Sequence, residues 1–227
     1  MKHDDHALRA AVATFPPVWL EAFRALRIDL STEAGRGKLP GLKKLPLFGI
    51  LPTRVPAQPL CARIDTLAPL AICTSLTEID LCTAPFSDLG PLRELAALRQ
   101  LTVFQTRIAS LEPLSRLQKL RALCVWCTPI VDLGPLARVS SLEALSIEYT
   151  RVSDLGPLAG LGKLRDLDIS GTAIVDLAPL ANVPLRSLVA YRTQIPEGSL
   201  AAFRAAHPEC SVQIGDAYPP REVRCGC

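Results

Sequence analysis

The cysteines of this chain are the residues whose types and spacing suggest chemistry most directly. Cys124 and Cys127 form a C-x-x-C motif, and Cys225 and Cys227 stand in a second close pair at the last positions of the sequence. A C-x-x-C pair supports thiol–disulfide exchange where a helix N-terminus lowers the thiol pKa. A structural zinc site needs four ligands, which these two pairs would supply together. The elements that position them decide between these possibilities and an incidental role.

Those elements repeat every 22 residues. The dipeptide Pro-Leu begins at positions 69, 91, 113, 135, 157 and 179. Self-similarity at such a period is typical of a solenoid, in which each unit buries its apolar face by stacking on the next. We therefore expect an extended surface rather than an enclosed catalytic cleft.

Each unit combines two periodicities. Leu101 to Phe104 alternates between the two faces of an extended chain, which predicts a short strand. Leu89, Leu92 and Leu95 are three residues apart, which predicts a 3-10 turn. An aspartate that can accept hydrogen bonds from first-turn N–H groups precedes the turn in four units. These residues are Asp88, Asp132, Asp154 and Asp176.

The pattern resembles the leucine-rich repeat, L-x-x-L-x-L-x-x-N-x-I, in its short 22-residue class found in internalins and related bacterial proteins. The resemblance covers residues 64–195. It implies an α/β solenoid, a horseshoe with parallel strands on the concave face, mostly 3-10 turns on the convex side, and a helical N-terminal cap. The family's asparagine, which forms a hydrogen-bonded ladder to loop backbone, is replaced here. We expect a thinner ladder from the hydroxyl groups that stand there instead. The replacing residues are Thr106, Thr128, Thr150, Thr172 and Thr193, with Ala84 in the first clear unit.

The pattern divides the chain into four segments. They are a helical cap and loop (1–44), the repeats (45–195, with about six clear units from residue 65), a C-terminal capping repeat (196–214) and a flexible tail (215–227). The cap is predicted to contain an amphipathic helix at 17–27, because apolar side chains fall on one face. These are Trp19, Leu20, Phe23 and Leu26, with a loop expected at 33–44. The C-terminal repeat is predicted to contain a helix at 199–206 and a strand at 211–214.

Composition excludes several classes of protein. The chain is 49% hydrophobic, with a mean hydropathy of +0.26, but no apolar run approaches the roughly 18 residues of a membrane span. The net charge of +3 does not indicate general affinity for nucleic acid. The N-terminus is too charged for a secretory signal. We expect a cytoplasmic protein with reduced thiols, without membrane or nucleic-acid partners.

The repeat register argues against thiol chemistry. Cys73 occupies a core leucine position, Cys124 lies on a strand, and Cys127 opens the turn after it. No helix is predicted to begin there, so nothing would lower the thiol pKa. A second pair of zinc ligands would have to come from the tail or from distant residues. We interpret these thiols as incidental and expect no metal and no cofactor, with redox or metal binding as the alternative.

Register also predicts a binding surface on the concave face. Phe104 and Trp126 occupy the same position in neighbouring units, and Tyr149 lies one unit further, at the margin. Exposed aromatic residues beside polar ones are typical interface anchors. The alternative is that the two rings pack on each other and on a flanking segment. The predicted partner-binding residues are Phe104, Gln105, Trp126, Glu148, Tyr149, Asp168, Tyr191 and Arg192.

Charge is sorted by register as well. Arg99, Arg121, Arg165 and Arg186 share the position just before each strand, interrupted by Glu143. We interpret this arrangement as a solvated face. The alternative is that it steers an acidic partner.

The repeats contain no glycine-rich phosphate loop, no cluster of histidines or carboxylates, and no ordered nucleophile and base. The sequence therefore predicts no enzyme and no catalytic residues. It predicts a monomeric protein–protein interaction module that binds a protein partner on its concave face. The resemblance to bacterial repeats favours a bacterial protein. The alternative function is an effector that recognises a target inside a host cell.

Overall fold

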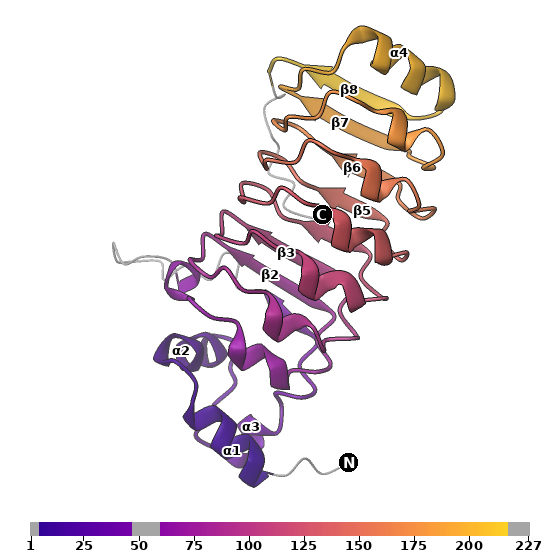
Figure 1. The fold of residues 1–227 in the computed structure, drawn as a ribbon. Helices are drawn as coiled ribbons and strands as arrows, with labels where there is room; N and C mark the ends of the chain where they lie inside the picture. The colour runs from indigo at the N-terminus through magenta and orange to yellow at the C-terminus, as the bar shows by residue number, and fades with distance from the viewer. Residues whose placement is uncertain (1–4, 47–59, 218–227) are drawn as a thin grey trace.

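The structure is a computed structural model that describes residues 5–46 and 60–217 (Figure 1). Its strands form one parallel sheet, in which each strand pairs with the next one in the chain. The strands are β1 (Lys44–Pro46), β2 (Glu78–Cys82), β3 (Gln100–Phe104), β4 (Ala122–Cys124), β5 (Ala144–Ser146), β6 (Asp166–Asp168), β7 (Ser187–Tyr191) and β8 (Ser211–Gly215). The sheet is open and does not close into a barrel, as expected for a leucine-rich repeat horseshoe.

The register of the sheet reproduces the sequence period. Leu101 of β3 pairs with Leu123 of β4, which pairs with Leu145 of β5, so equivalent residues of successive repeats lie side by side. The step shortens between β6 and β7, where Leu167 pairs with Leu188, because the last unit lacks one residue. The predicted parallel strands are therefore confirmed, and β1 and β8 extend them at the two ends.

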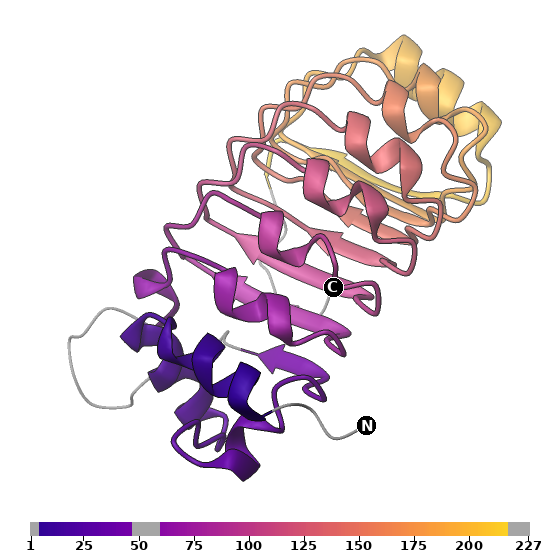
Figure 2. The same cartoon turned by 60° about the horizontal axis from the view of Figure 1, so that its bottom comes forward.

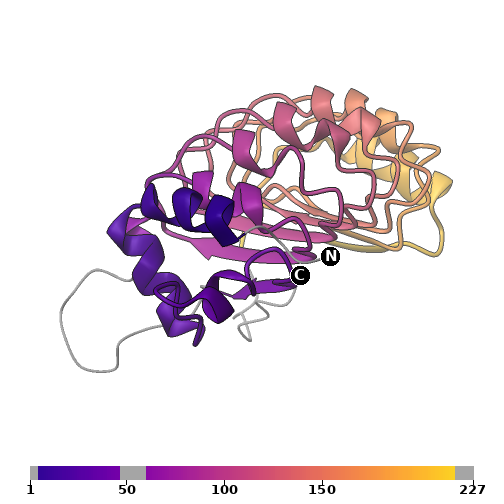
Figure 3. The ribbon, with the colours of Figure 1, turned by 90° about the horizontal axis from the view of Figure 1, so that it is seen from below.

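A layer of short 3-10 helices covers the convex side, opposite the sheet (Figures 2 and 3). They are Leu60–Arg63, Ala68–Ile72, Gly90–Leu92, Glu112–Arg116, Gly134–Arg138, Gly156–Leu158 and Ala178–Leu180. The predicted aspartate caps are confirmed. Asp88, Asp132 and Asp154 each accept a hydrogen bond of 2.7 Å from the backbone N–H two residues later. Asp176 does the same at 2.8 Å. Proline stands at the second position of every 3-10 helix after Leu60–Arg63, where no donor is needed.

The core lies between the sheet and the 3-10 layer. The apolar register positions from Leu67 to Ala190 are buried in every repeat, including Cys73 in place of leucine. Ile195, the last position of the pattern, is partly buried. Each repeat thus buries its face against its neighbours, as a solenoid requires.

The N-terminal end is covered by α1 (Asp5–Ala13), α2 (Pro17–Ala25) and α3 (Glu33–Arg36). Trp19 and Phe23 of α2 are fully buried, and the Trp19 indole N–H donates to the carbonyl of Thr66 at 2.8 Å. The predicted helix is confirmed, but Leu20 is 36% exposed and does not share its buried face. The expected loop at 33–44 is wrong in part, because it contains α3 and ends in β1.

The C-terminal end is covered by α4 (Glu197–Ala206), which packs Leu200 and Phe203 into the core. His207 lies on Phe203, with ring centroids 4.5 Å apart, and its Nε2 is 2.9 Å from the carbonyl oxygen of Leu180. Strand β8 ends at Gly215, so the first residue of the predicted tail belongs to the sheet. Residues 218–227 lie outside the described residues. No helix in the described part of the chain is long and apolar enough to cross a membrane.

Candidate binding surface

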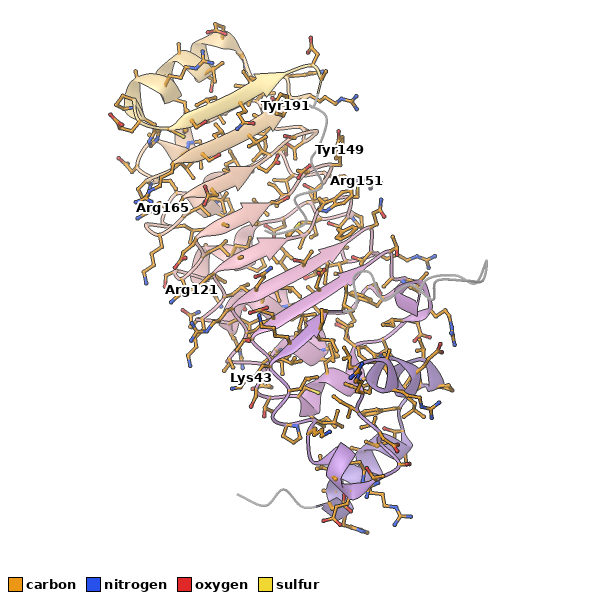
Figure 4. All side chains as sticks on the ribbon, turned by 180° about the vertical axis from the view of Figure 1, so that it is seen from behind. Lys43, Arg121, Tyr149, Arg151, Arg165 and Tyr191 are labelled. Carbon is orange, nitrogen blue, oxygen red and sulfur yellow. The ribbon has the colours of Figure 1, made fainter. Side chains whose placement is uncertain are left out.

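The concave side of the sheet is seen from behind in Figure 4. Because side chains alternate along a strand, Leu101 and Val103 of β3 point into the core, whereas Thr102 and Phe104 point to the concave side. The same alternation holds in the neighbouring strands, so equivalent residues form rows across the sheet. Adjacent members of a row are about 4.8 Å apart.

Phe104 and Trp126 are neighbours on this face, as predicted. Their rings are stacked, with centroids 4.6 Å apart and planes inclined by 9°. Offset stacking of aromatic rings contributes beyond the area it buries. The expectation that both rings face solvent is wrong for Phe104, which is only 5% exposed, whereas Trp126 is partly buried. The first part of the alternative, that the rings pack on each other, is therefore confirmed, whereas packing on the tail concerns residues 218–227, outside the described residues.

The face becomes polar toward the C-terminal repeats. Glu148 is 7% exposed, and its carboxylate accepts a hydrogen bond of 3.3 Å from the Ser146 hydroxyl. Asp168 accepts a hydrogen bond of 3.0 Å from the backbone N–H of Ser170. The hydroxyl oxygen of Ser170 in turn accepts one of 3.0 Å from the backbone N–H of Tyr191. The first two bonds lie within single repeats, whereas the bond from Tyr191 to Ser170 joins two neighbouring repeats.

The residues that follow the strands form what we call the end edge. They share a left-handed backbone conformation, with φ between 52° and 65°. Each donates its backbone N–H to the carbonyl of the next repeat, at 2.8–3.1 Å. The backbone hydrogen-bond ladder therefore continues past the strands, by one residue after β2, β3 and β7 and by three residues after β4, β5 and β6. The end edge comprises Thr83, Gln105, Cys127, Tyr149, Gly171 and Arg192.

Tyr149 is the most prominent member of the end edge. It is 38% exposed, and its ring lies so close against Gly171 of the next repeat that a β-carbon at this glycine would stand 2.5 Å from Cδ1 of the ring. Gln105 and Arg192 of the end edge are exposed as well. Figure 4 shows Tyr149 on this edge of the sheet, with Tyr191 nearby. The accessible part of the predicted surface therefore lies at the end edge rather than in the middle of the sheet.

The threonines that replace the family's asparagine do not form a ladder between repeats. Thr128, Thr150 and Thr172 each donate their hydroxyl to the carbonyl three residues earlier, at 2.6, 2.7 and 2.5 Å, within their own repeat. Thr193 does so at 2.9 Å, whereas the buried hydroxyl of Thr106 has no hydrogen-bond partner. The expected ladder is corrected to a turn-closing bond, because a short hydroxyl side chain reaches only its own strand.

Asp80 of β2 is a feature that register reasoning did not single out. One carboxylate oxygen of Asp80 is buried without a hydrogen-bond partner, and desolvation raises the pKa of the group. It lies beside Pro46 of β1 and Thr102 of β3 in the sheet. A carboxylate at the first concave position of a strand was visible in the sequence, but its burial was not.

The thiols are dispersed over the fold. Burial raises the pKa of Cys73 to about 12, so its thiolate is not formed near neutral pH. Cys124 is buried on the concave side of β4, Cys127 belongs to the end edge, and burial also raises the pKa of Cys210; all four are thiols. Within residues 5–46 and 60–217, no three His, Cys, Asp or Glu side chains could hold a metal ion together. Cys225 and Cys227 lie outside the described residues.

Comparisons with known proteins agree with this architecture. No family sequence profile and no curated protein sequence matches the chain. Among solved structures, internalin C2 of Listeria monocytogenes is 26% identical, with a TM-score of 0.69 over 90% of this chain and 96% of that one. The internalin InlF of the same organism is 22% identical, with a TM-score of 0.66 over 90% of this chain. This chain spans only 64% of the InlF structure.

A leucine-rich repeat protein of Leptospira interrogans is 19% identical, with a TM-score of 0.62 over 66% of this chain and 40% of that one. At this level of identity the likeness concerns the fold. The open parallel sheet, the 3-10 layer and the helical cap occur together in this chain. The chain therefore has the leucine-rich repeat fold seen in the internalins.

Proposed function

We propose that the protein is a non-catalytic binding module that holds a protein partner against its concave face and end edge. The neighbours with this fold support a protein-interaction module in general. The observation that carries the finer proposal is the exposed Tyr149, which is held in the backbone ladder of the repeat that follows the stacked Trp126. Aromatic side chains on rigid supports are efficient interface anchors, because they lose little conformational entropy on binding.

Burial divides the eight predicted residues into two roles. Gln105, Tyr149 and Arg192 are exposed, and Trp126, Asp168 and Tyr191 are partly buried, so these six have surface for a partner. Phe104 and Glu148 are buried, so their proposed role is support. Phe104 fixes the plane of the Trp126 indole through the stack.

The proposal places the protein as a monomer in a bacterial cytoplasm, with a protein rather than a nucleic acid as its partner. The Listeria and Leptospira neighbours support a bacterial setting. A chain with eight cysteines and an ample core fits a reducing compartment. An effector role would instead require the partner to come from a host cell.

Affinity capture with matched variants tests the proposal. We expect Trp126→Ala/Tyr149→Ala to lose at least about tenfold in affinity for the captured partner, because anchor residues each contribute more than about 1 kcal/mol. Val131→Ala/Val175→Ala is the control, since it removes exposed apolar groups from the segments that lead from the end edge to the 3-10 layer. Capture from bacterial and from eukaryotic lysates separates the two settings. A partner that binds the Trp126/Tyr149 variant as tightly as the wild type, with circular dichroism unchanged, would contradict the proposed surface.

A further inference from the structure

The opposite edge of the sheet carries a row of cationic side chains, which we call the start edge. Its residues immediately precede strands β3 to β7: Arg99, Arg121, Glu143, Arg165 and Arg186. They are neighbours in space, because the backbone N–H of each residue after the first donates to the carbonyl of the one before, at 2.7–2.8 Å. Figure 4 shows Arg121 and Arg165 along one edge, with Lys43, and Tyr149, Arg151 and Tyr191 along the other.

The start edge has an uneven charge pattern. Glu143 stands between two pairs of arginines and forms an ion pair with Arg121, with 3.7 Å between Nη1 and Oε1. Among the described residues, this is the only ion pair that a start-edge residue forms. Arg165 also donates Nη1 to the carbonyls of Gly162 and Leu164, at 3.1 and 3.0 Å, which holds its guanidinium near the row.

The surroundings strengthen the positive potential of this edge. Further exposed cations lie on the adjoining convex flank, where the chain descends from the 3-10 layer to the next strand. These are Arg116, Lys119, Arg138 and Lys163. A surface with an excess of positive charge attracts partners of the opposite sign over about a Debye length.

We propose that the start edge binds an extended acidic segment of a protein, with two acidic residues about four positions apart. Adjacent strands are about 4.8 Å apart, so Arg99 and Arg121 form one pair and Arg165 and Arg186 another, with their centres about 14 Å apart. Four residues of extended chain span about the same distance, at roughly 3.4 Å per residue. Planar guanidinium groups bind carboxylates through paired hydrogen bonds, which gives this arrangement its selectivity.

Glu143 favours a peptide over a nucleic acid. A nucleic-acid strand carries a negative charge at every nucleotide, so a phosphate would lie against Glu143 when both arginine pairs were occupied. A peptide can place neutral side chains opposite Glu143 and acidic ones opposite the arginines. The start edge lies across the sheet from Tyr149, so this inference does not depend on the proposed partner of the concave face.

Fluorescence anisotropy with the full chain tests the proposal. The probe is a labelled Gly/Ser peptide with two glutamates four positions apart, compared with one of equal composition whose glutamates are adjacent. Arg99→Gln/Arg186→Gln removes one cation from each pair and should weaken binding of the spaced peptide about tenfold. Arg107→Gln/Arg151→Gln is the matched control, because it removes two exposed arginines from the other edge and should change the affinity less than about twofold.

A gain of function completes the test. Glu143→Gln should strengthen binding of the spaced peptide severalfold, a result that impaired folding cannot produce. Glu143→Arg should reduce the preference for the spaced peptide and admit single-stranded oligothymidylate. The proposal is overturned by equal losses in the two double variants, by affinity that does not fall with added salt, or by wild-type protein that binds oligothymidylate more tightly than the peptide.

Discussion

The two edges of the sheet share one backbone ladder but place different demands on their residues. At the start edge the backbone is ordinary and the side chains reach solvent. At the end edge every residue has a left-handed φ, and only Gly171 among them is glycine. A left-handed backbone costs a residue with a β-carbon about 1–2 kcal/mol relative to the right-handed one. The end edge therefore carries backbone strain that the start edge lacks.

The hydrogen bonds explain how that strain is tolerated. Each end-edge N–H donates to the next repeat, so the conformation is fixed by the stacking of repeats and not by the residue that occupies the position. At the start edge the ladder involves only backbone groups in an ordinary conformation, so the position accepts side chains of either charge. The comparison teaches that a substitution at the end edge changes backbone strain as well as any partner contact, whereas one at the start edge changes mainly the surface charge.

Gly171→Ala should give the largest change, a loss of about 2 kcal/mol in the free energy of unfolding. It combines a left-handed φ with a β-carbon 2.5 Å from the Tyr149 ring. Urea denaturation followed by circular dichroism measures the loss. Gly162→Ala is the control, because its β-carbon meets nothing within 4 Å.

The Tyr149→Ala background separates the two causes. Without the ring, Gly171→Ala should cost only about 1 kcal/mol, the remainder being backbone strain. An equal cost in both backgrounds would show that the ring moves aside freely, which would remove its rigid support at the end edge.

Thr172→Val should be the next largest change, with a loss of about 1.5 kcal/mol. It deletes the buried bond from the hydroxyl to the Ile169 carbonyl while it keeps the side-chain shape. Thr106→Val is the matched comparison, since the buried Thr106 hydroxyl has no partner and its removal should be neutral or stabilising. Equal losses at the two positions would contradict the turn-closing role of the threonine hydroxyl.

Gln105→Gly should stabilise the fold relative to Gln105→Ala by about 1 kcal/mol. Both substitutions remove the exposed side chain, but only glycine adopts φ of 53° without strain. The difference in urea midpoint between the two variants measures the strain at the end edge directly. If alanine proved as stable as glycine, the left-handed conformation would carry no cost there.

The repeats could be predicted from the sequence because each position has many counterparts. Leu101, Leu123 and Leu145 occur 22 residues apart, and a register shared by so many residues allows one arrangement of strands and core. The aspartate caps followed from the same register. The N-terminal cap lacks this redundancy, so α1 and β1 were missed and Leu20 was placed on the wrong face.

The sequence predicted which side chains lie on the concave face, but not how far each one is exposed to solvent. Register placed Phe104 beside Trp126, yet the burial of Phe104 depends on the three-dimensional packing around its ring, which the repeat pattern does not encode. The reach of a threonine hydroxyl and the left-handed φ at Gln105 are likewise properties of the folded turn. The residue types at these positions, threonine and glutamine, do not by themselves indicate either property.

The ion pair of the start edge gives the smallest expected effect and the sharpest contrast between the edges. Arg121 and Glu143 are about half exposed, so solvent screens their attraction, and a double-mutant cycle with alanine should measure a coupling of about 0.5 kcal/mol or less. The single variants should likewise leave the unfolding midpoint nearly unchanged. A coupling above about 1 kcal/mol would mean that the fold depends on charge at the start edge, and a substitution there would then change stability as one at the end edge does.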